Sequence, residues 1–357
     1  MAIYQVLEAL DYGDGVSNDV ISKSRVLTDL GYETGIYSKW INEKVEKYRT
    51  SVELLKPSKS DIILFHFSQK SSLLNKVKSL KCKKVLVYHN VTPPQFFESY
   101  RSEQFRGCTQ ECSEGLQQLK KNIKYFDYFL ADSEFNKQDL LNMGASDIDV
   151  LPIFIDFKVM KTFSIVKEIV EGYQNRDVIL FVGRVVPNKR HKDIIDTFDY
   201  YYRKISNNAV LIFVGNHSDY SEYYSELLSK LMDLKCKNNV VFTDKVENSE
   251  LYTYYQIAKA FLCMSEHEGF CIPLLESMNF EIPTIAYDAS AVSATMGGSG
   301  VLFYEKDIPT IAELLNVVIK NVKVRGEIIS KQNLWIKNFT ENAIKDKIDK
   351  LIKKWID

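Results

Sequence analysis

The sequence predicts two doubly wound α/β domains in a chain of 357 residues. The chain is too long for one hydrophobic core, so two domains are expected. Short apolar runs rich in β-branched residues alternate with helical patterns, and these runs form two separate series. The runs are apolar on both faces, which is typical of parallel strands that helices cover on each side.

Each series contains six predicted strands. The first series comprises residues 3–10, 33–38, 61–68, 83–90, 127–133 and 149–155. The second series comprises residues 177–185, 209–216, 239–246, 259–265, 283–290 and 300–305. A polar, irregular stretch at 156–176 separates the two series and is expected to link the domains. The expected domains therefore cover residues 1–160 and 170–330.

The last part of the chain, 331–357, is predicted to be helical. One amphipathic helix is expected from about Ser330 to Trp355, because apolar residues recur there at helical spacing and form one stripe. The stripe consists of Ile336, Phe339, Ile344, Ile348, Leu351 and Trp355. Such a helix needs an apolar surface to cover.

Composition and charge exclude several classes of protein. The chain is 45% hydrophobic and 26% charged, as in ordinary globular proteins, and its net charge of -1 argues against nucleic-acid binding. No apolar run approaches the length of a bilayer span, and the start lacks a signal-peptide pattern, so a cytoplasmic protein is expected. Lysines cluster at 76–84 and 120–124. They form either solvated helix faces or a peripheral contact with the inner face of the membrane.

Six cysteines in so long a chain are not a disulfide framework. Cys108 and Cys112 are four residues apart, but no second Cys/His pair with zinc-ligand spacing accompanies them. We therefore expect reduced thiols and no bound metal.

A glycine-containing loop follows the first predicted strand, where doubly wound sheets bind ligands. Gly13 and Gly15 precede a helix, and glycines there let the backbone approach a ligand and aim N–H groups at it. The loop lacks the third glycine of a dinucleotide fingerprint, and Asp11 and Asp14 would repel a pyrophosphate. An ordinary tight turn is the alternative interpretation.

A basic loop follows the strand at 177–185. Arg184 and Lys189 lie between this strand and the next helix, where Arg binds phosphate through its bidentate fork and Lys acts as a point charge. Plain surface solvation is the alternative for both residues. Arg190 and Lys192 are expected to face solvent.

The segment 265–277 carries the strongest chemical pattern. Pro273 fits the first turn of a helix, so residues 269–271 would present N–H groups at its positive end, as a diphosphate cradle. Glu268 and Glu276 can reach the same place, one for sugar hydroxyls and the other for a ribose diol. The alternative is that Glu276 only complements the helix dipole and Glu268 is an ordinary loop carboxylate.

His89 ends the predicted strand at 83–90, so it also lies at the carboxyl end of a sheet. A structural and a catalytic role both remain open for it. His66, in the preceding strand, has the weaker claim and is interpreted as a packed side chain.

These residues resemble a known family. The segment from Glu268 to Glu276 is similar to the E-x7-E motif of retaining glycosyltransferases with the GT-B fold, in particular family 4. Arg184 and Lys189 resemble the diphosphate loop of that family. Further similar segments lie at 131–135, 286–288 and 297–300, and segment 88–94 resembles bacterial polysaccharide-type transferases.

The resemblance implies a GT-B fold, with two Rossmann-like domains facing a cleft. The first domain would bind the acceptor and the second the nucleotide sugar. The terminal helix, at 331–357, would cross back and pack on the first domain.

The resemblance also implies roles for matching residues. Arg184 and Lys189 would neutralise the leaving diphosphate, and Glu268 would hold hydroxyls of the donor sugar. Glu276 would bind the ribose, and His89 would lie close to the anomeric centre. Further donor contacts are implied at Gly15, Gly215, Val246, Gly269, Phe270, Cys271 and Ile272. Cys271 departs from the family pattern, because glycine is usual there.

The implied activity is that of a retaining hexosyltransferase that needs no metal. Its donor would be a UDP- or GDP-sugar, and its acceptor a glycan or a lipid-linked molecule in surface polysaccharide or glycoconjugate synthesis. A nucleotide-sugar epimerase and a non-catalytic GT-B subunit of a transferase complex are the alternatives. A phosphorylase would need a pyridoxal lysine, and no segment suggests one.

Overall fold

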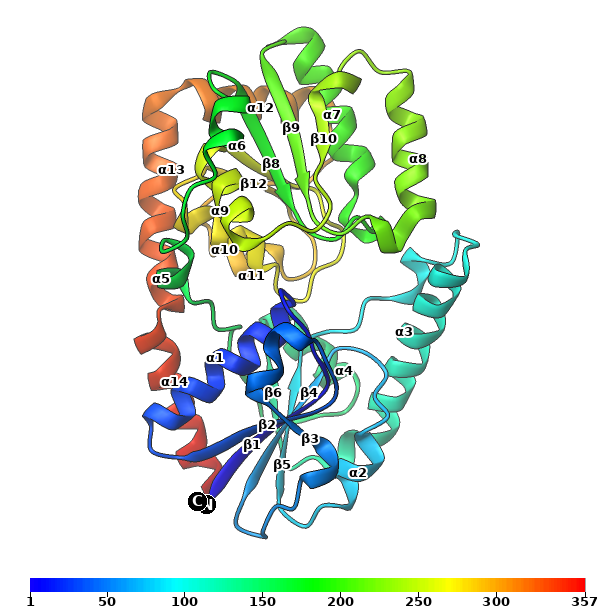
Figure 1. The fold of residues 1–357 in the computed structure, drawn as a ribbon, viewed down its shortest axis with the longest axis vertical. Helices are drawn as coiled ribbons and strands as arrows, with labels where there is room; N and C mark the ends of the chain where they lie inside the picture. Colours follow the sequence, from blue (N-terminus) through cyan, green and yellow to red (C-terminus); the bar gives the residue numbers. More distant parts are fainter. Residues whose placement is uncertain (357) are drawn as a thin grey trace. The chain divides into compact units, whose positions relative to one another are not determined.

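A computed structural model describes residues 1–356, which divide into two compact units (Figure 1). Unit 1 consists of Met1–Pro94, Thr109–Asp156 and the chain from Asn338 onward. Unit 2 consists of Gln95–Cys108 and Phe157–Lys337. Each unit contains one sheet whose ladder pairs are all parallel.

Unit 1 contains a seven-stranded sheet with the order β3-β2-β1-β4-β5-β6-β7. The strands are β1 (Ala2–Leu10), β2 (Glu33–Ile41), β3 (Arg49–Ser51), β4 (Ile62–Phe67), β5 (Lys83–Tyr88), β6 (Tyr128–Ala131) and β7 (Ile148–Val150). The order reverses between β1 and β4, which pair from Ile3↔Ile62 to Val6↔Phe65. Strand β3 is absent from the sequence prediction because three residues carry no readable apolar pattern.

Helices cover both faces of this sheet (Figure 1). One face packs on α1 (Gly15–Asp29) and α14 (Glu341–Ile356), through buried residues such as Leu64 and Leu27. The other face packs on α2 (Leu74–Ser79), α4 (Glu134–Asn142) and the second part of α3 (Glu103–Asn122). Short 3-10 turns complete the unit: η1 (Glu43–Tyr48), η2 (Val52–Leu54), η3 (Pro94–Phe96) and η4 (Ile123–Tyr125), with η3 ending in unit 2.

Unit 2 contains a six-stranded sheet with the order β10-β9-β8-β11-β12-β13. Its strands are β8 (Asp177–Val182), β9 (Ala209–Val214), β10 (Val240–Phe242), β11 (Ala260–Cys263), β12 (Thr284–Tyr287) and β13 (Val301–Phe303). The order again reverses at one place, between β8 and β11. All twelve predicted runs overlap a strand, although the run 149–155 meets β7 at residues 149–150 only, and the two doubly wound sheets confirm the predicted fold class.

The helices of unit 2 lie on both faces of its sheet (Figure 1). They are α5 (Phe157–Met160), α6 (Lys167–Gly172), α7 (His191–Lys204), α8 (Ser221–Met232), α9 (Asn248–Ile257), α10 (Ile272–Asn279), α11 (Val292–Met296), α12 (Ile308–Lys320) and α13 (Val322–Trp335). Short 3-10 turns lie at η5 (Pro187–Lys189), η6 (Ser218–Tyr220) and η7 (Lys237–Asn239). The stretch 156–176, which was expected to be irregular, contains the short helices α5 and α6.

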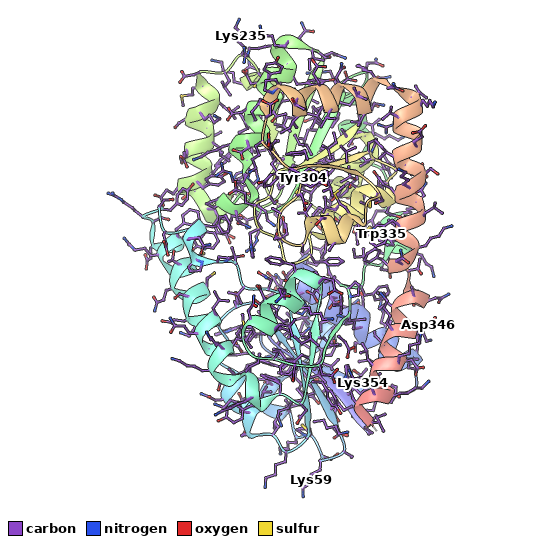
Figure 2. All side chains as sticks on the ribbon, turned by 180° about the vertical axis from the view of Figure 1, so that it is seen from behind. Lys59, Lys235, Tyr304, Trp335, Asp346 and Lys354 are labelled. Carbon is purple, nitrogen blue, oxygen red and sulfur yellow. The ribbon has the colours of Figure 1, made fainter. Side chains whose placement is uncertain are left out.

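The single helix predicted from Ser330 to Trp355 is wrong. Helix α13 ends at Trp335, a 3-10 turn η8 (Ile336–Phe339) follows, and α14 begins at Glu341. The Trp335 indole N–H, labelled in Figure 2, donates to the Thr295 carbonyl over 2.7 Å and fixes the end of α13 in unit 2. The chain breaks its helix there because the apolar stripe serves two different surfaces.

Helix α14 belongs to unit 1. Ile344, Ile348, Ile352 and Trp355 are buried in one cluster with sheet residues such as Val85. Lys354, labelled in Figure 2, pairs with Asp147 and Asp149, with an Nζ–Oδ distance of 2.8 Å to each. The prediction that the terminal helix packs on the first domain agrees with these contacts.

The segment Gln95–Cys108, which includes the start of α3, packs in unit 2, although the sequence placed it within 1–160. The Glu222 carboxylate accepts hydrogen bonds from the Arg101 and Ser102 backbone N–H groups over 2.8–3.0 Å. The Tyr100 ring lies 4.5 Å from Phe105 and 5.8 Å from Tyr223, measured between centroids. These are single contacts and not part of a repeating pattern, so the sequence alone did not predict them.

Candidate functional site

Two loops meet at the strand reversal of unit 2. The basic loop runs from Gly183 to Lys189 after β8, and the acidic loop, 264–271, follows β11. The Glu266 N–H donates to the Asn188 carbonyl over 2.9 Å, and the Asn188 side-chain amide donates to the His267 carbonyl over 3.0 Å. Asn188 is buried, so these bonds join the basic loop and the acidic loop into one structure.

Lys189 and Glu268 form an ion pair between these loops. The Lys189 Nζ lies 2.5 Å from the Glu268 Oε2, and both side chains are largely shielded from solvent, at 17% and 8% exposure. The Glu268 N–H is in turn held by the Ser290 hydroxyl at 2.8 Å. Removing one partner would leave a poorly solvated charge, so the pair fixes both loops.

Arg184 is exposed and lies beside Tyr220, to whose hydroxyl it donates from Nη1 over 3.2 Å. It follows Gly183, whose backbone N–H donates to the Val214 carbonyl at 2.9 Å. A Cβ on Gly215 would lie 2.2 Å from the Gly183 carbonyl oxygen, and Gly215 has φ +148°. Glycine at 215 therefore permits the close approach that positions the basic loop.

Arg190 and Lys192 do not simply face solvent, as the sequence suggested. Both side chains are half-buried. Arg190 pairs with Asp193 at 2.9 Å and with Glu266 at 3.3 Å, and Lys192 pairs with Glu226. Acidic side chains from distant segments surround this part of the chain, which local sequence could not show.

Helix α10 begins where the sequence places it, with Pro273 in its first turn and Cys271 as the N-cap. Cys271 has φ 72° and ψ 66°, a left-handed conformation that costs a non-glycine residue about 1–3 kcal/mol. The N–H groups of the first turn point away from the helix toward its N-terminal side. Together with the helix dipole they form a site suited to an anion.

Glu276 lies one turn into α10 and is half-buried. The Tyr255 hydroxyl donates to its Oε2 over 2.7 Å. Burial raises the pKa of Glu276 to about 7, although the Tyr255 hydrogen bond acts in the opposite direction. Its ionised form can accept hydrogen bonds from two neighbouring hydroxyls, as a ribose diol offers.

The remaining residues expected at this site lie around the same loops. Val246 is half-buried in the connection between β10 and α9, and Ile272 is the first residue of α10. Phe270 is buried, and its carbonyl accepts a hydrogen bond from the Thr295 hydroxyl at 2.5 Å. The structure thus brings the basic loop, the two acids and the α10 start to one edge of the unit 2 sheet.

Sequence analysis missed a contact between two thiols. The Sγ atoms of Cys263, at the end of β11, and Cys271 lie within 4.8 Å of each other. Interaction between the two thiols lowers the pKa of Cys263 and raises that of Cys271 well above its usual value. Their separation of eight residues gave no signal, because a loop rather than a helix brings the sulfurs together.

A second polar cluster lies in unit 1, at the ends of β4, β5 and β6. The His89 Nδ1 lies 2.7 Å from the Asp132 Oδ2, and its Nε2 lies 2.8 Å from the His66 Nδ1. Both ring nitrogens of His89 are therefore engaged, and among the described residues the buried His66 Nε2 has no partner. Burial, with the His89 and Lys23 charges, lowers the pKa of His66 well below its usual value.

Helix α1 adds a buried ion pair to this cluster. Asp19 is 0% exposed and Lys23 is 2% exposed, and their side chains lie 2.6 Å apart. The other Asp19 oxygen accepts the Phe154 N–H at 2.7 Å. Burial raises the pKa of Asp19, against the attraction of Lys23 and His89. The sequence signal was present: an acid and a base four residues apart lie among the buried apolar residues of α1.

The glycine loop before α1 has a local structural role. The Asp14 side chain accepts the Ser17 N–H at 2.9 Å and caps the helix, and Gly15 is the first helical residue. Gly13 has φ 75°, as a tight turn requires. Asp14, which the sequence analysis expected to repel a pyrophosphate, is therefore the N-cap of α1.

Residues 165–335 match a model of the family described as "Glycosyl transferases group 1". The matched segment contains the basic loop, both acids and the α10 start. It covers most of unit 2.

Three relatives named for a transferase or synthase activity match part of the chain. It is 24% identical over 220 residues to the alpha-monoglucosyldiacylglycerol synthase of Acholeplasma laidlawii, covering 59% of this chain and 54% of that protein. It is 26% identical over 231 residues to the O-antigen chain mannosyltransferase RfbU of Salmonella typhimurium, covering 64% and 60%. It is 28% identical over 247 residues to the lipopolysaccharide 1,6-galactosyltransferase of Salmonella typhimurium, covering 64% of each. The chain thus spans less than two thirds of each relative's length.

Solved structures match nearly the whole chain. Anabaena Alr3699/HepE in complex with UDP-glucose superimposes with a TM-score of 0.76 at 14% identity, covering 99% of this chain and 100% of that one. A glycosyltransferase from Rickettsia africae ESF-5 gives 0.73 at 16% identity, covering 98% of each chain. At identities this low, the superpositions establish the fold alone. The chain has the GT-B fold.

Gly215→Ala should destabilise unit 2 by about 1–3 kcal/mol, because the new methyl group would collide with the Gly183 carbonyl at an unfavourable φ. Urea unfolding followed by circular dichroism measures this. The matched control is Gly326→Ala in α13, where a Cβ meets nothing within 4 Å. That variant should gain about 0.5–1 kcal/mol as a helical Gly→Ala change. Equal stability of the two variants would contradict the packing described.

Glu276 should make stability depend on pH. Its folded-state pKa of about 7 lies above the ordinary 4.5, so the protonated form favours the folded state. This contribution is complete below pH 4.5 and is lost as the pH rises through about 7. Glu276→Gln stays neutral. The wild-type free energy of unfolding, minus that of the variant, should therefore fall over this range and level off above it. A difference constant with pH would disprove the raised pKa.

Proposed function

We propose that the protein is a glycosyltransferase that moves a sugar from a nucleotide diphosphate sugar to a glycan or lipid-linked acceptor. One observation carries the proposal: in unit 2 the basic loop and the α10 start converge at the strand reversal, joined by the Lys189–Glu268 pair. Doubly wound sheets bind their ligands at this point. The group 1 match over residues 165–335 and the transferase relatives support it.

The donor's two phosphates would be held by Arg184, Lys189 and the N–H groups at the start of α10. Without a ligand, Lys189 is neutralised by Glu268. A diphosphate would compete for the Lys189 ammonium and release the Glu268 carboxylate for hydroxyls of the donor sugar. Charge on the departing diphosphate would then be stabilised electrostatically, without a metal.

The nucleoside would lie along the same edge of the sheet. Glu276 would accept hydrogen bonds from the ribose diol, and Val246 would lie beside the base. Gly215 and residues 269–272 would complete the donor contacts. A UDP-linked sugar is our first choice over GDP, because Anabaena Alr3699/HepE is solved with UDP-glucose in the same fold.

The acceptor is proposed to be lipid-linked or a surface polysaccharide. One relative is named for a diacylglycerol product and two for O-antigen or lipopolysaccharide. In unit 1, Lys78 and Lys124 from the two lysine clusters lie 4.7 and 5.5 Å from the centroid of the exposed Tyr125 ring. A basic patch around an aromatic ring suits peripheral contact with an acidic lipid surface. No helix within residues 1–356 combines the length and apolarity of a bilayer span.

Transfer is proposed to retain the anomeric configuration, as in family 4. The acceptor hydroxyl would attack from the side of the departing diphosphate, and a phosphate oxygen would take its proton. The test is the one-bond C1–H1 coupling constant of the transferred sugar in the glycoside product, measured by NMR and compared with that of the donor. An inverted product would contradict this part of the proposal and leave the transferase assignment intact.

Arg184→Ala should lower turnover about 100- to 1000-fold, because one preorganised charge stabiliser is lost. Lys189→Ala should act similarly. The control is Lys235→Ala, an exposed lysine of unit 2 labelled in Figure 2, which removes the same charge and should leave turnover unchanged. Thermal stabilisation by UDP, GDP and ADP identifies the nucleotide, because a ligand of the folded state raises apparent stability.

Three outcomes would redirect the assignment. Normal turnover by both Arg184→Ala and Glu268→Gln would refute the site. Conversion of a free nucleotide sugar without any acceptor would identify an epimerase. Nucleotide binding without hydrolysis or transfer across a full donor panel would identify a non-catalytic subunit.

His89 is proposed to serve the reaction from unit 1, with Asp132 orienting its ring through the 2.7 Å contact between the Asp132 Oδ2 and the His89 Nδ1. Asp132→Asn should lower turnover about 100-fold, since the carboxylate that orients the imidazole is gone. Asp147→Asn is the control, because the Asp147 carboxylate is exposed and its ion pair is with Lys354, at the surface. Unchanged turnover in Asp132→Asn would contradict this role, and a turnover loss matched by a loss of folding stability in urea would indicate a purely structural Asp132.

A further inference from the structure

The thiols of Cys263 and Cys271, at the two ends of the acidic loop, are placed as a pair of metal ligands. Cys263 ends β11 and Cys271 is the N-cap of α10, so the loop between them closes with its ends together. Both side chains are buried, at 1% and 8% exposure. All six cysteines are free thiols. Buried sulfurs in contact provide two soft ligands on a rigid support, which a thiophilic metal prefers.

A carboxylate completes the set. One ligand atom each from Cys263, Glu268 and Cys271 lies within 4.8 Å of the other two. Zinc binds thiolate at about 2.3 Å and carboxylate at about 2.0–2.2 Å, so its ligands are about 3.5–3.8 Å apart in a tetrahedron. The three atoms therefore need only a small inward movement to share one cation, and the fourth position would stay open.

The charges of the site also suit a divalent cation. Glu268 is already paired with a cation, the Lys189 ammonium, at 2.5 Å. Binding of a metal(II) ion would release one proton from each thiol and form two metal–sulfur bonds. Two thiolates and one carboxylate would then face the metal charge and the displaced Lys189, which leaves this group of residues neutral overall.

We propose that Cys263, Cys271 and Glu268 bind a thiophilic divalent cation such as Zn²⁺ or Cd²⁺, and that this cation blocks the donor site. The statement that the cation blocks the donor site rests on the proposed function. A bound metal would hold Glu268 away from sugar hydroxyls and tie down Cys271, whose N–H belongs to the anion site at the start of α10. The cation is an inhibitor at this position, and transfer itself does not use it.

Metal binding is tested on the full chain, reduced with a phosphine. Cd²⁺ is titrated while the thiolate charge-transfer absorption is followed, and Zn²⁺ is titrated against a chromophoric chelator. One equivalent per chain is expected for the wild type and for Cys108→Ser/Cys112→Ser, the control that removes the other closely spaced thiols. Cys263→Ser/Cys271→Ser should lose the absorption and the tight Zn²⁺ binding, and Glu268→Gln should bind Zn²⁺ more weakly.

Cys271→Gly provides a variant that should fold well, because glycine accepts the left-handed backbone at this position without strain. It should unfold at a denaturant concentration at least as high as the wild type and still lose the metal. The proposal is overturned if the wild type gives no thiolate absorption, or if Cys271→Gly and the double serine variant bind the metal as the wild type does.

The effect on the donor is measured separately, by the thermal shift that UDP produces with and without Zn²⁺. Zinc should abolish the UDP-dependent shift in the wild type but not in Cys271→Gly, which controls for zinc bound to the nucleotide itself. An unchanged shift in zinc-loaded wild type would refute the inhibition. If none of UDP, GDP and ADP gives a shift even without zinc, the proposed function fails, while the absorption still decides the metal site.

Discussion

The joint between the two loops at the β8–β11 reversal is the constraint on which the candidate site depends. Lys189 and Glu268 attract each other across it in a poorly solvated place, and buried Asn188 bonds both loops through its backbone and its side chain. An ammonium group and a carboxylate thus lie on one rigid support. Each charge already has a partner, so a ligand exchanges partners instead of creating new charge in a shielded site.

Unit 1 also contains buried ionisable groups that need partners. They lie on α1 and at the carboxyl ends of neighbouring strands, and they are Asp19, Lys23, His66, His89 and Asp132. The ion pair and the hydrogen-bonded chain of carboxylate and imidazoles satisfy most of their polar atoms. Two remain without a partner among the described residues, the His66 Nε2 and the Asp132 Oδ1. Buried atoms of this kind are expensive in a purely structural core, which favours a functional role for this end of the sheet.

The elements of the fold were readable because their signals are local and repeat. Buried parallel strands are continuous apolar runs, and all twelve runs overlap a strand. Helix α10 was readable from Pro273, since a missing N–H is harmless in a first turn. The errors arose where distant contacts decide. Trp335, whose indole donates to the Thr295 carbonyl, is the last residue of α13, although the sequence predicted one continuous helix there.

By itself, the sequence determined two series of parallel strands, the basic loop and the acidic loop, because residue type and spacing encode them directly. Only the tertiary structure decided which side chains are partners. It joined Lys189 to Glu268, placed His89 between Asp132 and His66, and brought the Cys263 and Cys271 sulfurs together. The reason is that strand order, not chain order, sets these distances: β8 and β11 are neighbours across 77 residues of intervening sequence, from Gly183 to Lys259.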